Sequence, residues 1–157
     1  MSQPTTLFSE RVAVVAAIDP DAYTANTYTS SYVKCDKFHK YALVGMLGDE
    51  ATSGTPYGQT IFSIVQANTS GGGGVTTISG KSVTLTAAVP ASSEENQQCV
   101  INLDPAEDLD LDNGFYWIAA RAVVSADTCD AAAVLLGIDA KYSPASDNDS
   151  SAVNEIV

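Results

Sequence analysis

Hydrophobic and polar residues alternate along several short stretches of the chain, which is the pattern of half-buried β-strands. In KSVTLTAAV, residues 81–89, every odd position from Val83 to Val89 is apolar. In AAVLLGIDAKY, residues 132–142, every even position from Ala132 to Tyr142 is apolar. Further strands are predicted at residues 11–19, 40–47, 60–67, 99–103 and 115–124.

The segments between these stretches are rich in turn-forming residues. They include DPDAYTANTYTSS at 19–31, NTSGGGG at 68–74 and PASSEENQQ at 90–98. One place favours a helix: Asp104 suits the N-cap, Pro105 the first helical position and Glu107 the third. Seven or so short strands with one short turn helix predict an all-β fold, an antiparallel β-sandwich or barrel.

Several predicted strands are apolar on both faces. In residues 115–124 one face carries Tyr116 and Ile118, and the other carries Phe115, Trp117 and Arg121. In a free-standing sandwich, one face of each sheet is usually exposed to water. Additional apolar faces therefore indicate a covering layer or contact with other subunits. The alternative is a central strand covered by loops. Phe115, Trp117 and Arg121 are therefore our candidate subunit-contact residues.

The ends of the chain differ from its centre. We divide it into an N-terminal arm at 1–10, a β-sandwich domain at 11–142 and a C-terminal arm at 143–157. Neither extended terminus could form a core alone. The C-terminal segment passes through small polar residues to an apolar tip, so it is either a floppy tail or an arm lying on a neighbouring subunit. Ile156 is the contact candidate there.

Composition and charge reduce the number of functional classes to consider. The 157 residues suit one domain, and 45% hydrophobic with 17% charged residues indicates a folded chain. A net charge of −12 would repel nucleic-acid phosphates, so we predict no nucleic-acid partner. No apolar run is long enough to span a membrane, and no secretory signal is evident. Cys35, Cys99 and Cys129 are odd in number and far apart, which favours a reducing cytoplasm and thiols that act as apolar fillers.

The acidic stretch DLDLDNG, residues 108–114, raises the question of calcium. Asp108, Asp110 and Asp112 match positions 1, 3 and 5 of an EF-hand loop. Position 6 is Asn113 where glycine is required, and position 12 is Ala119 where a bidentate Glu is required. The stretch is therefore interpreted as a turn into a strand, and no metal or cofactor is predicted.

Catalytic chemistry has little support. His39 is the single histidine, and no ligand pair has zinc-like spacing. No G-x-S-x-G motif is present, and the glycine tract at 71–74 lacks the G-K-[ST] ending of a phosphate loop. A Ser/His/Asp or Cys/His site stays open, because its members meet only in the fold. We predict that the protein is not an enzyme.

Taken in order, several motifs resemble a known family. They are KFHKY (37–41), FSIVQANTSGGGG (62–74), LDLDNGFYWIAARAVV (109–124), AAVLLGIDAKYSPASD (132–147) and VNEIV (153–157). Together they resemble small virion proteins of tailed bacteriophages, from about residue 10 to the C-terminus. The resemblance implies a head decoration or cement protein, jelly-roll-like in fold and homotrimeric. It also implies assembly in the host cytoplasm and attachment to the major capsid protein on the capsid exterior, and it transfers no catalytic residues.

Two other functions remain open from the sequence. A neck or tail component, such as a terminator ring protein, would share the fold class and differ in copy number. A carbohydrate- or ligand-binding β-sandwich would use Trp117, Tyr116 and loop tyrosines as stacking platforms.

Overall fold

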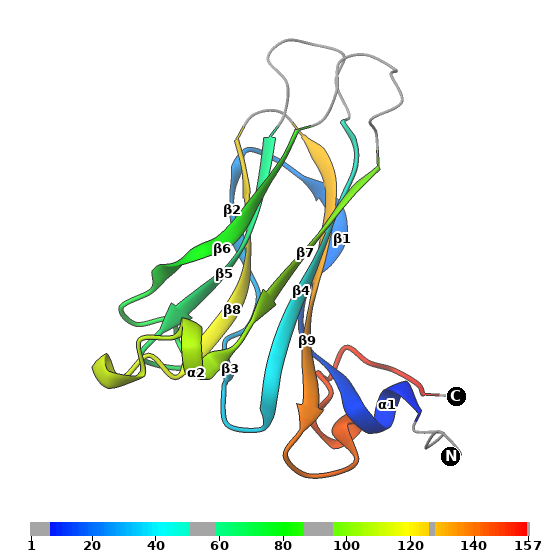
Figure 1. The fold of residues 1–157 in the computed structure, drawn as a ribbon. Coiled ribbons are helices and arrows are strands. Elements are labelled where there is room, and N and C mark those ends of the chain that lie inside the picture. Colours follow the sequence, from blue (N-terminus) through cyan, green and yellow to red (C-terminus); the bar gives the residue numbers. More distant parts are fainter. Residues whose placement is uncertain (1–6, 51–58, 87–95, 126–127, 157) are drawn as a thin grey trace.

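Two antiparallel β-sheets packed face to face form the body of the protein (Figure 1). The computed structural model describes residues 7–50, 59–86, 96–125 and 128–156. The first sheet has the order β1 (Val12–Tyr23), β9 (Cys129–Ala140), β4 (Phe38–Glu50) and β7 (Gln97–Leu103). The second has the order β2 (Asn26–Thr29), β8 (Trp117–Val124), β5 (Gln59–Ala67) and β6 (Thr76–Thr86), and β3 (Val33–Lys34) also pairs with β8. The prediction of an all-β sandwich is confirmed.

The strand pairs are nested along the chain. β1 pairs with β9, β2 and β3 pair with β8, β4 pairs with β7, and β5 pairs with β6, all antiparallel. Such nesting is what one long antiparallel hairpin produces when it is rolled up into two sheets. This is the jelly-roll arrangement, the fold that the resemblance implies.

Among the described residues, four short helical turns accompany the strands: α1 (Phe8–Arg11), α2 (Pro105–Asp108), η1 (Leu111–Asn113) and η2 (Ala145–Asn148). The turn predicted at 104–107 is confirmed as α2, where the Asp104 side chain accepts a 3.1 Å bond from the N–H of Ala106. The other three turns were not predicted from the sequence. Two of them lie where we expected extended termini: α1 overlaps the end of the segment at 1–10, and η2 lies within the segment at 143–157.

The first half of the C-terminal segment packs on its own chain. Ala145 is fully buried in the core. The N–H of Val14 donates to Asp149 Oδ1 at 2.7 Å, and the N–H of Ser150 donates to the carbonyl of Val14 at 2.6 Å. Because β1 is an edge strand, these bonds satisfy backbone groups that would otherwise face outward unpaired.

Large side chains fill the space between the sheets, and two glycines make room for them. The fully buried core includes Phe38, Tyr41, Leu43, Phe62, Ile64, Leu103, Ile118 and Leu135. A Cβ added to Gly45 would lie 2.6 Å from Cγ of Phe62, and one added to Gly137 would lie 2.5 Å from Cδ2 of Phe38. The two rings therefore occupy the space that a side chain on β4 or β9 would take.

Some strand boundaries differ from the prediction. β8 begins at Trp117 and not at Phe115, because the N–H of Phe115 donates to the carbonyl of Asp110 at 3.2 Å and so belongs to the preceding turn. β2 falls within the stretch 19–31 that we interpreted as turn-rich, and β3 follows this stretch where no strand was predicted. β6 begins at Thr76, and residues 87–89 of the strand predicted there lie outside the described residues.

Candidate interaction surfaces

The first sheet carries apolar side chains on its outward side as well as in the core. Along β9, Ala133 and Leu135 are fully buried in the core, whereas Val134 and Leu136 point the other way and are partly exposed. We call this outward side the first outer face. Its apolar members that are at least partly exposed include Val12, Val14, Ala17, Val44, Met46, Val100, Ala132, Val134, Leu136 and Ile138.

The apolar centre of this face is continuous across the four strands. Val134 pairs with Ala17 of β1 and Val44 of β4, and Val44 in turn pairs with Val100 of β7. Val100 is 61% exposed and Met46 is 40% exposed. Singly exposed apolar residues are ordinary on a protein surface, but a contiguous apolar patch marks an interaction site.

A groove lies at one end of the first outer face. Its volume is about 560 Å³, and Pro20, Asp21, Ala22, Met46, Gly48, Asp130, Ala131 and Ala132 line it. Both neighbours of β9 lose regular pairing here, β1 between Ile18 and Asp21 and β4 between Leu47 and Glu50. Such bulges bend strands and often occur beside functional sites.

The second outer face is the outward side of the β2-β8-β5-β6 sheet. Trp117 and Arg121 both point outward from β8 and are partly buried, and Arg121 pairs with Ser63 of β5. Within the described part of the chain, the buried atoms Ser63 Oγ and Arg121 Nε have no hydrogen-bond partner. An unpaired donor of this kind lowers stability unless an incoming group satisfies it.

The structure brings together two of the four predicted contact residues. Trp117 and Arg121 share the second outer face, as their spacing predicted. Phe115 lies in the turn before β8 and is not part of that strand face. Ile156, which is 52% exposed, follows η2 in the segment that packs against β1 of the other sheet. The sequence missed the first outer face as a surface, although the even positions of 132–138 carried its signal.

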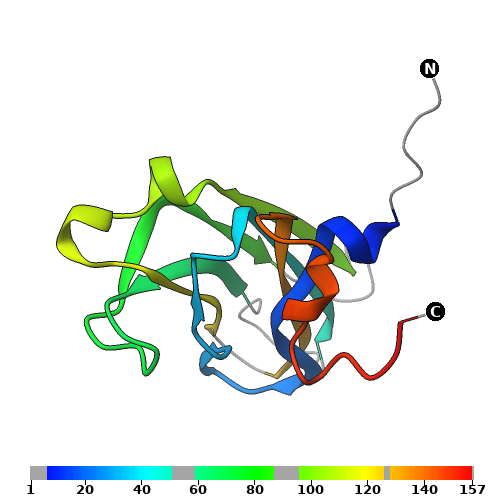
Figure 2. The same ribbon diagram turned by 90° about the horizontal axis from the view of Figure 1, so that it is seen from below.

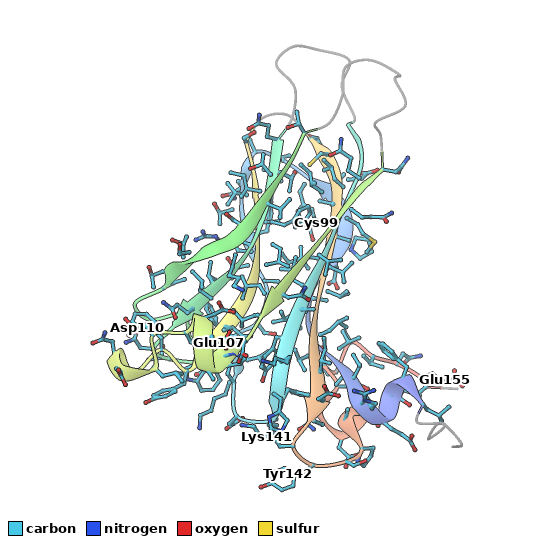
Figure 3. All side chains as sticks on the ribbon, in the orientation of Figure 1. Cys99, Glu107, Asp110, Lys141, Tyr142 and Glu155 are labelled. Carbon is cyan, nitrogen blue, oxygen red and sulfur yellow. The ribbon has the colours of Figure 1, made fainter. Side chains whose placement is uncertain are left out.

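The acidic stretch forms a capped turn between β7 and β8. Asp108 accepts a 2.7 Å bond from the N–H of Asp104 and pairs with Lys81 at 2.7 Å. Burial acts to raise the pKa of Asp108, but the bonds from Lys81 and the Asp104 backbone outweigh it, so the pKa lies below its ordinary value. Asp110, seen with Glu107 at the side of the molecule in Figure 3, accepts bonds from the Asn113 side chain.

This turn ends at Gly114, whose φ of 83° suits glycine. The prediction that the stretch is a turn into a strand is confirmed. No group of three or more His, Cys, Asp or Glu side chains that could hold a metal ion occurs among the residues the structure describes.

Two of the thiols, Cys35 and Cys99, lie in environments that keep them protonated. Burial raises the pKa of Cys35 to about 12, and burial also raises the pKa of Cys99, which packs between the sheets (Figure 3). A thiol is a weak nucleophile compared with a thiolate, so neither group is poised for attack at neutral pH. Cys129 is fully buried in the core. For Cys99 and Cys129, the prediction that the cysteines fill apolar space is confirmed.

Comparison with known proteins adds no identity to this description. No protein-family model matches the chain, and a search of curated proteins finds no match either. Among the described helices, none is long and apolar enough to cross a bilayer.

Proposed function

We propose that this chain is a structural virion protein that decorates the phage head, binding the assembled lattice of the major capsid protein and stabilising it. The observation that carries the proposal is that both sheets of the sandwich direct apolar side chains outward, at Val134 and Leu136 on one face and at Trp117 on the other. A protein with two such faces is suited to work between neighbours. The jelly-roll topology and the ordered motifs of the sequence support the same role.

The second outer face is the proposed contact with the shell. Trp117 offers a large, partly exposed ring, and Arg121 offers a guanidinium whose Nε lacks an acceptor within the described chain. Tryptophan and arginine are the residues that most often dominate binding energy at protein interfaces. A carboxylate on the capsid protein would pair with the positive charge of Arg121, whose side chain is partly exposed.

Stabilisation would follow from mass action. A ligand that binds the assembled shell and not its free subunits shifts the equilibrium toward the shell. Each contact can be modest, because many copies act on one particle. Together they would oppose the loss of any single capsid subunit.

Copy number in purified virions tests this function directly. Quantitative mass spectrometry of purified particles should find the chain in a simple ratio to the major capsid protein, in hundreds of copies. A count of only a few chains per particle would instead identify a neck or tail ring. Absence from mature particles would rule out a virion role altogether.

A further inference from the structure

The first outer face carries opposite charges at its two ends. Val44 and Val134 are paired at its centre. Asp130 lies four residues from Val134 along β9 and is exposed beside the groove. Lys40 lies four residues from Val44 along β4 and is paired with Ile138. Because the two strands are antiparallel, Lys40 is at the opposite end of the face from Asp130. The order along the face is therefore carboxylate, apolar centre, ammonium.

This order is self-complementary. A two-fold axis running across the strands at the level of Val44 and Val134 would place the apolar centres of two copies against each other. The same operation would place Asp130 of one copy at the Lys40 end of the other. Lys40 already pairs with Asp104 of its own chain, but its side chain is 52% exposed and can receive a second carboxylate. Isologous interfaces of this kind are the commonest in homo-oligomers.

The shapes of the two ends of the first outer face are also complementary. At the Lys40 end, α1 stands on the side of the first sheet that faces away from the second sheet (Figure 2). Leu7, just before this helix, is 67% exposed, and Phe8, its first residue, is 66% exposed. At the Asp130 end the face is hollowed by the groove of about 560 Å³. The two-fold operation brings the projecting apolar residues of one copy to the hollow of the other.

The charges at the groove favour this occupant as well. Asp21 and Asp130 line the groove and form no ion pair with any residue the structure describes. The approaching α1 carries Arg11 in its last turn, where the arginine pairs with an exposed Asp139. Exposed ion pairs contribute little stability, so Arg11 can exchange or share partners at small cost.

The size of the face is sufficient for a reversible dimer. Eight residue steps along β9 and four strands correspond to about 27 Å by about 19 Å, or roughly 500 Å² on each copy. Two copies would bury about 1,000 Å², at the lower limit for a specific interface. The expected complex is therefore concentration-dependent.

We propose that two copies of this chain pair through their first outer faces, antiparallel, with Leu7 and Phe8 of each copy in the groove of the other. This pairing goes beyond the proposed shell binding and does not depend on it. The pairing uses the first sheet, whereas Trp117 and Arg121 lie on the second. It also differs from the trimer that the resemblance implies. The partner is a second copy of the same chain, and the result is a four-layered stack of sheets.

Sedimentation velocity of the full chain over a wide concentration range tests the pairing. The chain should move from monomer to dimer as concentration rises. Val134→Lys should weaken dimer formation about tenfold or more, because it places a charge in the apolar centre. Thr84→Lys is the matched control: it adds the same charge at an exposed position on β6 of the other sheet, and it should leave the dimer unchanged.

A charge exchange tests the register. Asp130→Lys alone and Lys40→Glu alone should each weaken the dimer, and the two together in one chain should restore it, because each copy then presents the reversed order of charges. Circular dichroism confirms that each variant is folded. A wild-type chain that stays monomeric, a trimer insensitive to Val134→Lys, or failure of the double variant to recover would each overturn the proposal. None of these outcomes bears on whether the chain is present in virions.

Discussion

At the scale of single residues, the core depends on aromatic rings seated over glycine. Phe62 comes from the second sheet and reaches Gly45 of the first, so this contact ties the two layers together. Phe38 covers Gly137 within the first sheet. Glycine weakens an isolated strand, but here the missing side chain is replaced by a ring. The fit leaves no room for a methyl group at either position.

Gly45→Ala should therefore lower the free energy of unfolding by about 1–3 kcal/mol, the usual cost of overpacking a core. The new Cβ would lie within 2.9 Å of both Phe62 and the Cys99 sulfur, and neither can move far between packed sheets. Urea unfolding followed by circular dichroism measures the change. Gly71→Ala serves as the control, because nothing lies within 4 Å of a Cβ there, and it should have little effect. Equal stability of the two variants would contradict this account of the core.

At the scale of elements, the turn between β7 and β8 is held by ion pairs. Lys40 bonds to Asp104, and Lys81 pairs with Asp108. The pKa of Asp104 is lowered, first by the hydrogen bond from Lys40, and the pKa of Asp108 is lowered once the Lys81 bond has overcome burial. The turn therefore links α2 to β4 and β6 through charge.

The sign of the pH dependence follows from these lowered values. Both carboxyl groups titrate below their ordinary value of 3.8 in the folded chain. Their stabilising contribution is complete above the unfolded value and is lost as the pH falls through the folded values. Asp108→Asn should lower Tm at neutral pH and flatten the fall of Tm below about pH 4. Differential scanning calorimetry against pH measures this, with Asp112→Asn, an exposed position in the same turn, expected to behave like wild type.

The C-terminal segment protects the open edge of β1. A chain ending after Ser150 keeps Ala145 in the core and both bonds to Val14, so its Tm should stay near that of the full chain. A chain ending after Tyr142 loses these contacts and exposes an edge strand, so it should melt earlier and aggregate. Thermal melts with light scattering compare the two. Matching behaviour would show that the segment does not protect the edge.

The sequence predicted the existence of most strands better than their orientation. Alternation at 132–138 showed two distinct faces, but the face that carries Val134 and Leu136 lies outside while Leu135 lies in the core. Periodicity cannot decide which face is covered, because that depends on the partner sheet. β2 was missed because NTYT is polar and short, although its threonine and tyrosine favour strands. The groove could not be predicted, since it arises from pairing irregularities between distant strands.

At the scale of the whole molecule, the two outer faces divide the proposed contacts between them. The first presents an apolar centre with opposite charges at its ends, and the second presents Trp117 and Arg121. A sandwich used on both sides can join a neighbour and a lattice at once. In the proposed role, the net charge of −12 would also make coated particles repel one another in solution.

Substitution at the second outer face should separate shell binding from folding. Trp117→Ala and Arg121→Met should each weaken binding to capsids that lack the protein, by about 2 kcal/mol or roughly thirtyfold if both are central contacts. Gln98→Ala, an exposed position on β7 of the first sheet, should bind normally. Co-sedimentation of purified protein with such capsids gives the affinities. If Trp117→Ala instead unfolds the subunit and any folded fraction binds normally, the ring serves the fold and not the shell.

The nesting of the strands has a consequence for how the protein is made. β9 lies between β1 and β4 in the first sheet, yet it is the last strand to be synthesised. Until residues 129–140 leave the ribosome, the first sheet lacks the strand between β1 and β4, so β1 has no partner strand in that sheet. Long-range pairing of this kind slows folding and leaves apolar strands uncovered meanwhile. The first sheet therefore cannot close before β9 has been synthesised.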